Sequence, residues 1–144
     1  MKIITPVTPA ELETYYRLRW EVLRAPWNQP LGSEKAPDDA TATHALMINE
    51  AGEAVGVCRL HLETPTEAQI RFMAVDPAYQ GQGLGQMLLA YLEEKARAAG
   101  ALYITLQARE NACPFYLRCG YQVLEKTHLL FGSIQHYKMR KELV

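Results

Sequence analysis

The sequence predicts one mixed α+β domain over residues 1–144, with a mostly antiparallel sheet flanked by helices. Strand-like runs at residues 44–49, 54–63 and 68–75 are separated only by short turns, which is typical of antiparallel hairpins. The third run is followed by an amphipathic helical pattern and then by another apolar, β-branched run. This order indicates a strand–helix–strand crossover at the centre of the chain.

The first helix has a well-marked start and end. After a short strand predicted at residues 2–4, Thr8 and Glu11 form a capping box, and Pro9 occupies the first helical position. Pro26 ends the helix, because proline interrupts the helical hydrogen-bond pattern. The apolar stripe of this helix consists of Leu12, Tyr15, Tyr16, Leu18, Val22 and Leu23.

The segment from residue 25 to residue 43 is long for a loop and includes the acidic pair Asp38 and Asp39. Long loops in compact domains are often functional, so we expect this segment to border a ligand site. It also has room for a short helix of its own. We expect Trp20 and Trp27 to pack beneath the segment rather than to stack on a ligand.

Charged residues on the central strands have either structural or functional roles. In residues 54–63, the alternation of side chains places Arg59, His61 and Glu63 on one face. His61 is as consistent with a hydrogen-bonded structural histidine as with a catalytic one. Arg71 lies in an otherwise apolar strand, where an unpaired charge is unfavourable. It therefore points outward, pairs with an acid such as Glu63, or lines a pocket for an acidic substrate.

Glycines are concentrated just after the strand that ends at Val75. Gly81, Gly83 and Gly85 lead into a helix predicted from residue 84 to residue 99. Small residues let successive backbone N–H groups converge, and a helix N-terminus adds about half a positive charge. The turn therefore predicts a phosphate or pyrophosphate cradle, although it matches neither a P-loop nor a Rossmann turn. The apolar face of the helix is Leu84, Met87, Leu88, Tyr91 and Leu92.

The last third of the chain combines strands with one short helix. Residues 102–107 form an apolar, β-branched run that predicts a strand. Asn111 can cap a short helix that extends to Leu117 and tolerates Pro114 in its first turn. The final strands are expected at residues 122–131 and 135–143.

The composition narrows the class of protein. A net charge of −1 argues against a nucleic-acid partner, because nucleic-acid-binding domains are usually strongly basic. No apolar stretch approaches the ~20 residues of a membrane span. The odd number of cysteines and their spacing argue against a disulfide framework and a zinc site, and we expect Cys113 to be an inert thiol. The N-terminus has no signal-peptide pattern, so a cytoplasmic location is expected.

Two motifs resemble those of the GNAT acetyltransferase superfamily. Residues 80–85, Gln-Gly-Gln-Gly-Leu-Gly, look like its Gln/Arg-x-x-Gly-x-Gly/Ala signature. Residues 111–121 are similar, with small offsets, to its Asn-x-x-Ala-x-x-Phe-Tyr-x-x-x-Gly-Phe/Tyr pattern. Residues 19–24, 29–34 and 70–75 resemble the acetyltransferase-like half of bacterial proteins that also carry a hot-dog thioesterase-like domain. We expect no such second domain in this chain.

The resemblance implies a GNAT-like acyl-CoA N-acyltransferase fold. It also implies that an acetyl group passes from acetyl-CoA to a primary amine of a small molecule by direct attack in a ternary complex, without a metal. Two alternatives stay open: a non-catalytic acyl-CoA-binding or sensor domain, and an acetyltransferase that acts on a protein amine. Pairing through the C-terminal strands is common in the related fold, so a homodimer is compatible with it. The implied coenzyme contacts are Met73, Ala74, Val75, Gln80, Gly81, Gln82, Gly83, Leu84, Gly85, Gln86, Asn111, Phe115 and Tyr116.

The resemblance also implies candidates for proton transfer. It places Tyr116 beside the coenzyme sulfur, where a phenol with a pKa of ~10 can protonate the leaving thiolate; core packing is the alternative role. Many family members carry a glutamate where this chain has Gln69, which cannot act as a base. The general base is therefore open between His61, His136, the nearby Glu67 and a water relay. The candidate substrate contacts are Glu21, on the first helix facing residues 25–43, together with Arg71 and His136.

Overall fold

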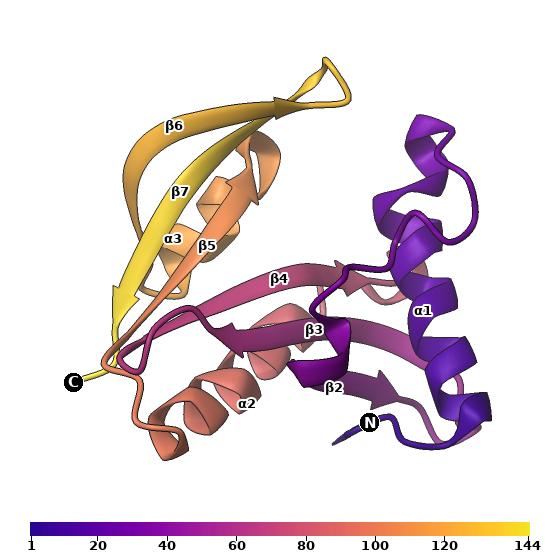
Figure 1. The fold of residues 1–144 in the computed structure, drawn as a ribbon. Coiled ribbons are helices and arrows are strands. Elements are labelled where there is room, and N and C mark those ends of the chain that lie inside the picture. Colours follow the sequence, from indigo (N-terminus) through magenta and orange to yellow (C-terminus); the bar gives the residue numbers. More distant parts are fainter. The chain divides into compact units, whose positions relative to one another are not determined.

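A computed structural model describes residues 1–144 and confirms the mixed α+β fold, whose elements are labelled in Figure 1. Seven strands form one sheet in the order β1-β2-β3-β4-β5-β7-β6. The chain divides into two compact units. The first unit comprises residues 1–61 and 72–92, and the second comprises residues 62–71 and 93–144.

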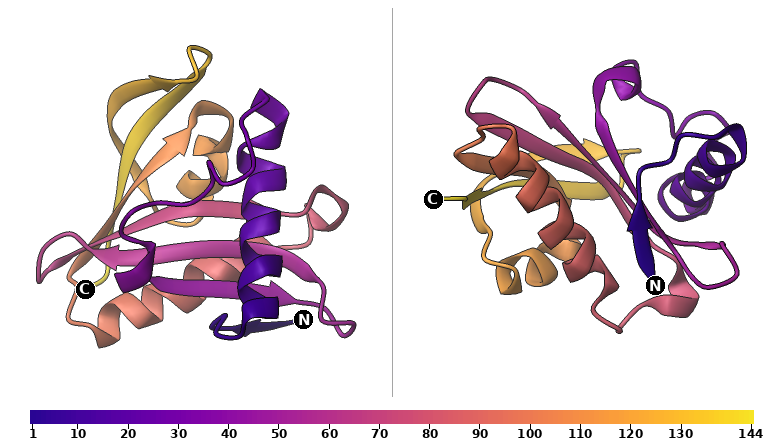
Figure 2. Two further views of the ribbon diagram at one scale, coloured as in Figure 1. Left: turned by 45° about the vertical axis from the view of Figure 1, so that its right-hand side comes forward. Right: turned by 90° about the horizontal axis from the view of Figure 1, so that it is seen from below.

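The first unit contains the N-terminal strands and the first helix. β1 (Lys2–Ile4), β2 (Thr43–Ile48) and β3 (Ala54–Leu62) pair in antiparallel fashion. α1 (Pro9–Leu23) crosses these strands in the left view of Figure 2, and the right view shows it beside one face of them. Because one side of α1 is apolar, it packs on the sheet. The resulting core cluster consists of Tyr15, Leu18, Leu46, Val57 and Ala74.

The predicted capping box of α1 is present. The hydroxyl of Thr8 accepts the N–H of Glu11 at 3.2 Å, and the Glu11 carboxylate accepts the N–H of Thr8 at 3.1 Å. Pro9 lies in the first turn, and the helix ends at Leu23, before Pro26. The capping interactions are local, so they could be predicted from sequence alone.

β4 (Glu67–Val75) and α2 (Leu84–Ala98) are divided between the two units, and β3 contributes its last residue, Leu62, to the second. The prediction for α2 is wrong at Met87, which is 47% exposed. The buried stripe of the helix includes Leu88 and Leu89 but not Met87. The side chains in this stripe are Leu84, Leu88, Leu89, Leu92 and Ala96.

The second unit contains the C-terminal elements. β5 (Tyr103–Arg109) runs parallel to the first residues of β4, which confirms the predicted crossover. β7 (Ile134–Glu142) pairs in antiparallel fashion with both β5 and β6 (Gln122–Leu130). β6 and β7 form a long hairpin in Figure 1. The short helix α3 (Cys113–Arg118) follows β5.

The predicted cap at Asn111 is not formed. Asn111 lies within a 3₁₀ turn, Glu110–Ala112, and Ala112 is the N-cap residue of α3, without a side-chain capping bond. Two features reduce the need for a side-chain cap here. The N–H of Cys113 bonds to the carbonyl of Glu110, and Pro114 has no N–H to be satisfied.

Candidate functional site

The glycine-rich turn links β4 to α2 within the first unit. The carboxylate of Asp76 accepts the N–H of Ala78 at 2.9 Å, and the Gln80 amide donates to the carbonyl of Val75 at 3.2 Å. Gly81 and Gly83 have φ angles of +79° and +78°, which L side chains rarely adopt. A Cβ at either glycine would meet no atom within 4 Å. Backbone conformation rather than tight packing therefore explains the glycines at these positions.

The start of α2 offers unpaired backbone donors. The N–H of Met87 bonds to the carbonyl of Gly83 at 3.2 Å, so the N–H groups of the preceding helical turn have no intrahelical partner. Leu84 is buried and anchors this end, whereas Gln82 and Gln86 are exposed and Gly85 is half-buried. The turn can therefore receive an anion at the positive end of the helix dipole.

The end of β4 precedes this turn and contains the residues expected near the thioester. Ala74 is buried, and Met73 and Val75 are half-buried. Directly before them, Phe72 has a φ angle of +58° in the middle of the strand. Such a conformation costs on the order of 1–3 kcal/mol for a residue other than glycine, and it clusters at functional sites. No sequence pattern indicated this feature.

Two buried arginines fasten the segment of residues 25–43. Arg19 of α1 donates to the Asp39 carboxylate at 3.0 Å and to the Glu34 carbonyl at 3.1 Å. Arg59 of β3 donates to both oxygens of Asp38, at 2.7 and 3.1 Å, and to Asp39 at 2.9 Å. Both arginine side chains are 0% exposed, and the hydrogen bonds from Arg59 lower the pKa of Asp38 to about 2. Each buried guanidinium thus has a carboxylate partner.

His61 is brought next to Arg59, as the strand alternation suggested. The Nδ1 atom of His61 lies 2.9 Å from an Arg59 nitrogen. Because a guanidinium group only donates hydrogen bonds, Nδ1 must accept, and its lone pair is engaged. In this arrangement the neutral ring carries its proton on Nε2. His61 is therefore oriented as a partner of Arg59 rather than as an open base.

A second histidine of the first unit, His44, belongs to the same polar network. Its Nε2 lies 2.7 Å from the Asp39 carbonyl and its Nδ1 lies 2.7 Å from the Tyr15 hydroxyl. Burial lowers the pKa of His44, which favours the neutral ring. Nε2 then donates to the carbonyl, and Nδ1 accepts from Tyr15. Sequence reasoning missed both Arg19 and His44, although Arg19 lies one helical turn after Tyr15 in the apolar stripe.

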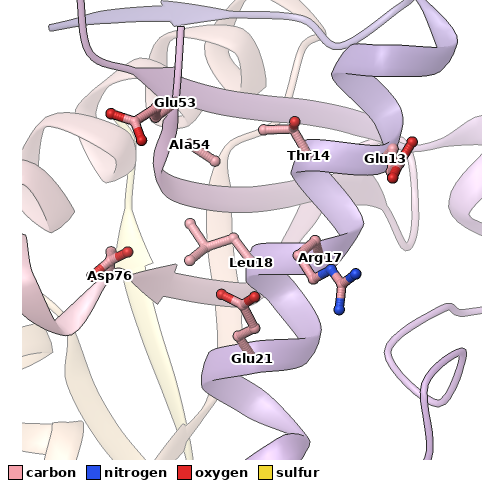
Figure 3. A pocket seen from close by; sticks show the side chains of 8 residues that line it. All are labelled: Glu13, Thr14, Arg17, Leu18, Glu21, Glu53, Ala54 and Asp76. Atoms are coloured by element: carbon pink, nitrogen blue, oxygen red, sulfur yellow. The ribbon is translucent and has the colours of Figure 1, made fainter. Parts of the chain in front are cut away.

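Glu21 lines a cavity of about 280 Å³ beside α1. Figure 3 shows its carboxylate on the side of Asp76 and the start of β3, so the expectation that it faces residues 25–43 is wrong. The physical reason is that Tyr16, Arg19 and Trp20 occupy the side of α1 that contacts that segment. The cavity is lined by Glu13, Thr14, Arg17, Leu18, Glu21, Glu53, Ala54 and Asp76.

In the second unit, the residues of the second motif differ in exposure. Tyr116 is 7% exposed, and its ring lies 5.0 Å from that of Phe115 and 5.8 Å from that of Tyr121, centroid to centroid. Asn111 is exposed and Phe115 is half-buried. Burial raises the pKa of the Cys113 thiol, which agrees with an inert cysteine.

The remaining candidate residues of the second unit have well-defined surroundings. His136 is 7% exposed, with Nδ1 3.0 Å from the Ile134 carbonyl and its ring stacked on that of His128 at 4.3 Å. Its Nδ1 therefore donates a hydrogen bond to that carbonyl. Glu67 accepts a hydrogen bond from the Thr105 hydroxyl at 2.7 Å. Arg71 is exposed.

Comparison with known proteins identifies the family. The model of the acetyltransferase (GNAT) family matches residues 12–121. An uncharacterized N-acetyltransferase of Bacillus subtilis, YjcF, is 25% identical over 142 residues, covering 99% of this chain and all of the relative. The aminoalkylphosphonate N-acetyltransferase of Salmonella typhimurium is 39% identical over 87 residues, covering 55% of this chain and 56% of that protein. The chain therefore belongs to the GNAT acetyltransferase family and is an N-acetyltransferase.

Solved structures agree with the fold. The crystal structure of an aminoglycoside 6′-N-acetyltransferase complexed with coenzyme A matches with a TM-score of 0.82. The match covers 100% of this chain and 98% of that one at 16% identity. None of the helices in the present structure is both long enough and apolar enough to cross a membrane. No group of three or more His, Cys, Asp or Glu side chains is arranged to hold a metal ion.

Proposed function

We propose that the protein transfers the acetyl group of acetyl-CoA to a primary amine of a small molecule, by direct attack in a ternary complex. The turn between β4 and α2 carries this proposal. Gly81 and Gly83 hold a backbone conformation with positive φ, next to the unpaired N–H groups at the start of α2. In the proposal these N–H groups bind the pyrophosphate of coenzyme A.

The proposed reaction needs a bound thioester, a neutral amine and a proton for the leaving group. The N–H groups of Met73–Val75 are the proposed donors to the thioester carbonyl. The amine loses a proton to a base or a water chain, and its nitrogen attacks the carbonyl carbon. The C–S bond then breaks, and the thiolate takes a proton, for which Tyr116 is the proposed donor. Asn111 and Phe115 are proposed coenzyme contacts on the strength of the family motif.

The cavity beside α1 supports a small cationic acceptor. Glu21, Glu13, Glu53 and Asp76 supply four carboxylates, against one arginine, around an apolar floor. Such a cavity attracts an alkylammonium group, which is the form an alkylamine takes near neutral pH. Its volume of about 280 Å³ suits a small molecule. One of its lining residues, Asp76, directly follows Val75 in the chain. Arg71 and His136 remain proposed substrate contacts.

An acetyl-transfer assay with a panel of small primary amines tests the proposal. Release of free coenzyme A and the mass of the acetylated product are measured with acetyl-CoA as donor. We expect turnover on at least one small amine. Binding of acetyl-CoA without turnover on any amine would instead support an acyl-CoA sensor. Turnover only on peptide lysines or N-termini would support a protein acceptor.

A further inference from the structure

Phe72 lies inside β4, directly before the three residues proposed to contact the thioester. Its φ angle of +58° departs from the extended conformation of a strand. A bulky side chain adopts this conformation only when its surroundings hold it there.

Three guanidinium groups surround this ring. Their central carbons lie 4.1 Å (Arg19), 5.4 Å (Arg59) and 5.7 Å (Arg24) from the ring centroid. Cations within about 6 Å of an aromatic face are attracted to its negative electrostatic potential. Arg19 and Arg59 are 0% exposed, so water screens these interactions little.

The two buried arginines are themselves held in place. Asp39 bridges them, accepting from Arg59 at 2.9 Å and from Arg19 at 3.0 Å. The Nε atoms of Arg19 and Arg59 are nevertheless buried without a hydrogen-bond partner. A buried donor without a partner is unfavourable. The positions of the two guanidinium groups must therefore be stabilised by contacts that do not involve Nε. The Phe72 ring is a contact that both arginines share.

We propose that Phe72 is a positioning residue for the thioester. The arginines hold its ring, the held ring maintains the left-handed backbone at this residue, and that backbone aims the N–H groups of Met73–Val75 at the thioester carbonyl. A local irregularity in a strand changes the direction of the groups that follow it. Donors aligned with the developing oxyanion accelerate acyl transfer. This inference rests on the proposed acetyl transfer.

A pair of substitutions separates the electrostatic role of the ring from its bulk. Phe72→Leu retains an apolar side chain but has no aromatic face, whereas Phe72→Tyr keeps the face. We expect Phe72→Leu to lower kcat at least tenfold, with KM for acetyl-CoA within twofold of the original. Phe72→Tyr is expected to stay within threefold in both constants. Thermal melting identifies folded variants, and Phe72→Met replaces the leucine variant if that does not fold.

A second readout does not require an acceptor. Hydrogen bonds to the thioester lower the infrared stretching frequency of its carbonyl, which ¹³C-labelled acetyl-CoA reports in the bound state. Phe72→Leu should show a smaller lowering than the original protein, and Phe72→Tyr an equal one. An unchanged frequency with unchanged kcat in the folded leucine variant would overturn the inference. Equal losses in both variants would also overturn it, because bulk alone would then be the cause. Absence of turnover on any amine would contradict the proposed function. The shift of the carbonyl frequency would still test whether Phe72 positions the thioester.

Discussion

Tyr116 is the residue with the most direct proposed role in proton transfer. Tyr116→Phe removes the hydroxyl and keeps the buried ring beside Phe115 and Tyr121. General acid catalysis contributes roughly 10²–10⁴-fold, so we expect kcat to fall about a hundredfold. The dissociation constant for acetyl-CoA should change less than twofold, as measured by calorimetry. Full activity in this variant would remove Tyr116 from the mechanism.

His44 makes stability depend on pH in a defined direction. Burial lowers its pKa in the folded protein, below the value of ~6.5 expected in the unfolded chain. The unfolded state therefore binds more protons on acidification. The contribution of neutral His44 is fully present above the unfolded pKa and is lost as pH falls through the folded pKa.

We expect the free energy of unfolding to fall less between pH 7.5 and pH 5.5 in His44→Gln than in the original protein. These two values lie about one unit above and below the ordinary histidine pKa of ~6.5. Glutamine can still donate to the Asp39 carbonyl and accept from Tyr15. Urea denaturation at the two pH values provides the measurement. His128→Gln, which changes an exposed histidine, is the control. An identical pH dependence in the His44 variant and the original protein would show that His44 does not cause the loss.

The sequence predicts a residue's role well when its partner is close along the chain. The Thr8–Glu11 cap was predictable because its hydrogen bonds span three residues. The partnership of Arg19 with Asp39 was not, because it joins residues twenty positions apart. The same limit applies to His61. Strand alternation predicted that His61 shares a face with Arg59, but it could not predict that Arg59 donates a hydrogen bond to the Nδ1 atom of His61.

At the scale of elements, the turn before α2 offers a matched test. Gly83→Ala and Gly52→Ala both place a Cβ where φ is close to +80° and no atom lies within 4 Å. We expect each to lower the free energy of unfolding by about 1 kcal/mol through backbone strain. Only Gly83→Ala should weaken coenzyme A binding, by about tenfold, because it alone disturbs the proposed phosphate donors.

Urea denaturation and calorimetric titration with coenzyme A provide the two measurements for this pair. Equal coenzyme affinities in the two folded variants would argue against a pyrophosphate site at the turn. A loss of affinity in both would indicate that general destabilisation is the cause. The Gly52 variant is informative because its turn, between β2 and β3, has no proposed coenzyme contact.

The segment of residues 25–43 shows what element prediction misses. Its length pointed to a role, and it does contain short 3₁₀ helices, Ala25–Trp27 and Asp39–Thr41. Its attachment depends on Arg19 and Arg59, which lie on α1 and β3. Because these contacts form only after the elements pack, no local pattern within the segment could reveal them.

For the whole molecule, the order of elements and the family could be predicted from sequence. Hydrophobic periodicity and turn residues gave the strands and helices, and two short motifs gave the GNAT family, which residues 12–121 match. The boundaries moved by a few residues, and the cap at Asn111 failed because a 3₁₀ turn begins α3. Fold class depends on many weak signals that agree, whereas a cap depends on one.

Coenzyme binding should stabilise the whole protein. A ligand that binds only the folded state adds RT ln(1 + [L]/Kd), which is about 2.7 kcal/mol at a hundredfold excess over Kd. We therefore expect acetyl-CoA to raise the melting temperature in a concentration-dependent manner. Pantothenate, which lacks the pyrophosphate, serves as the control and should give a much smaller rise. No shift with saturating acetyl-CoA would contradict the proposed cosubstrate.

The single carboxylate shared by Arg19 and Arg59 also affects how this chain can evolve or be redesigned. Replacing Asp39 would leave buried Arg19 without its carboxylate partner and Arg59 with Asp38 alone, so a change at one of these three positions affects the other two. Residues at the rim of the cavity beside α1, such as Glu13 and Glu21, have no such mutual dependence. A library intended to alter the proposed acceptor should therefore vary these cavity residues and keep the three linked positions fixed.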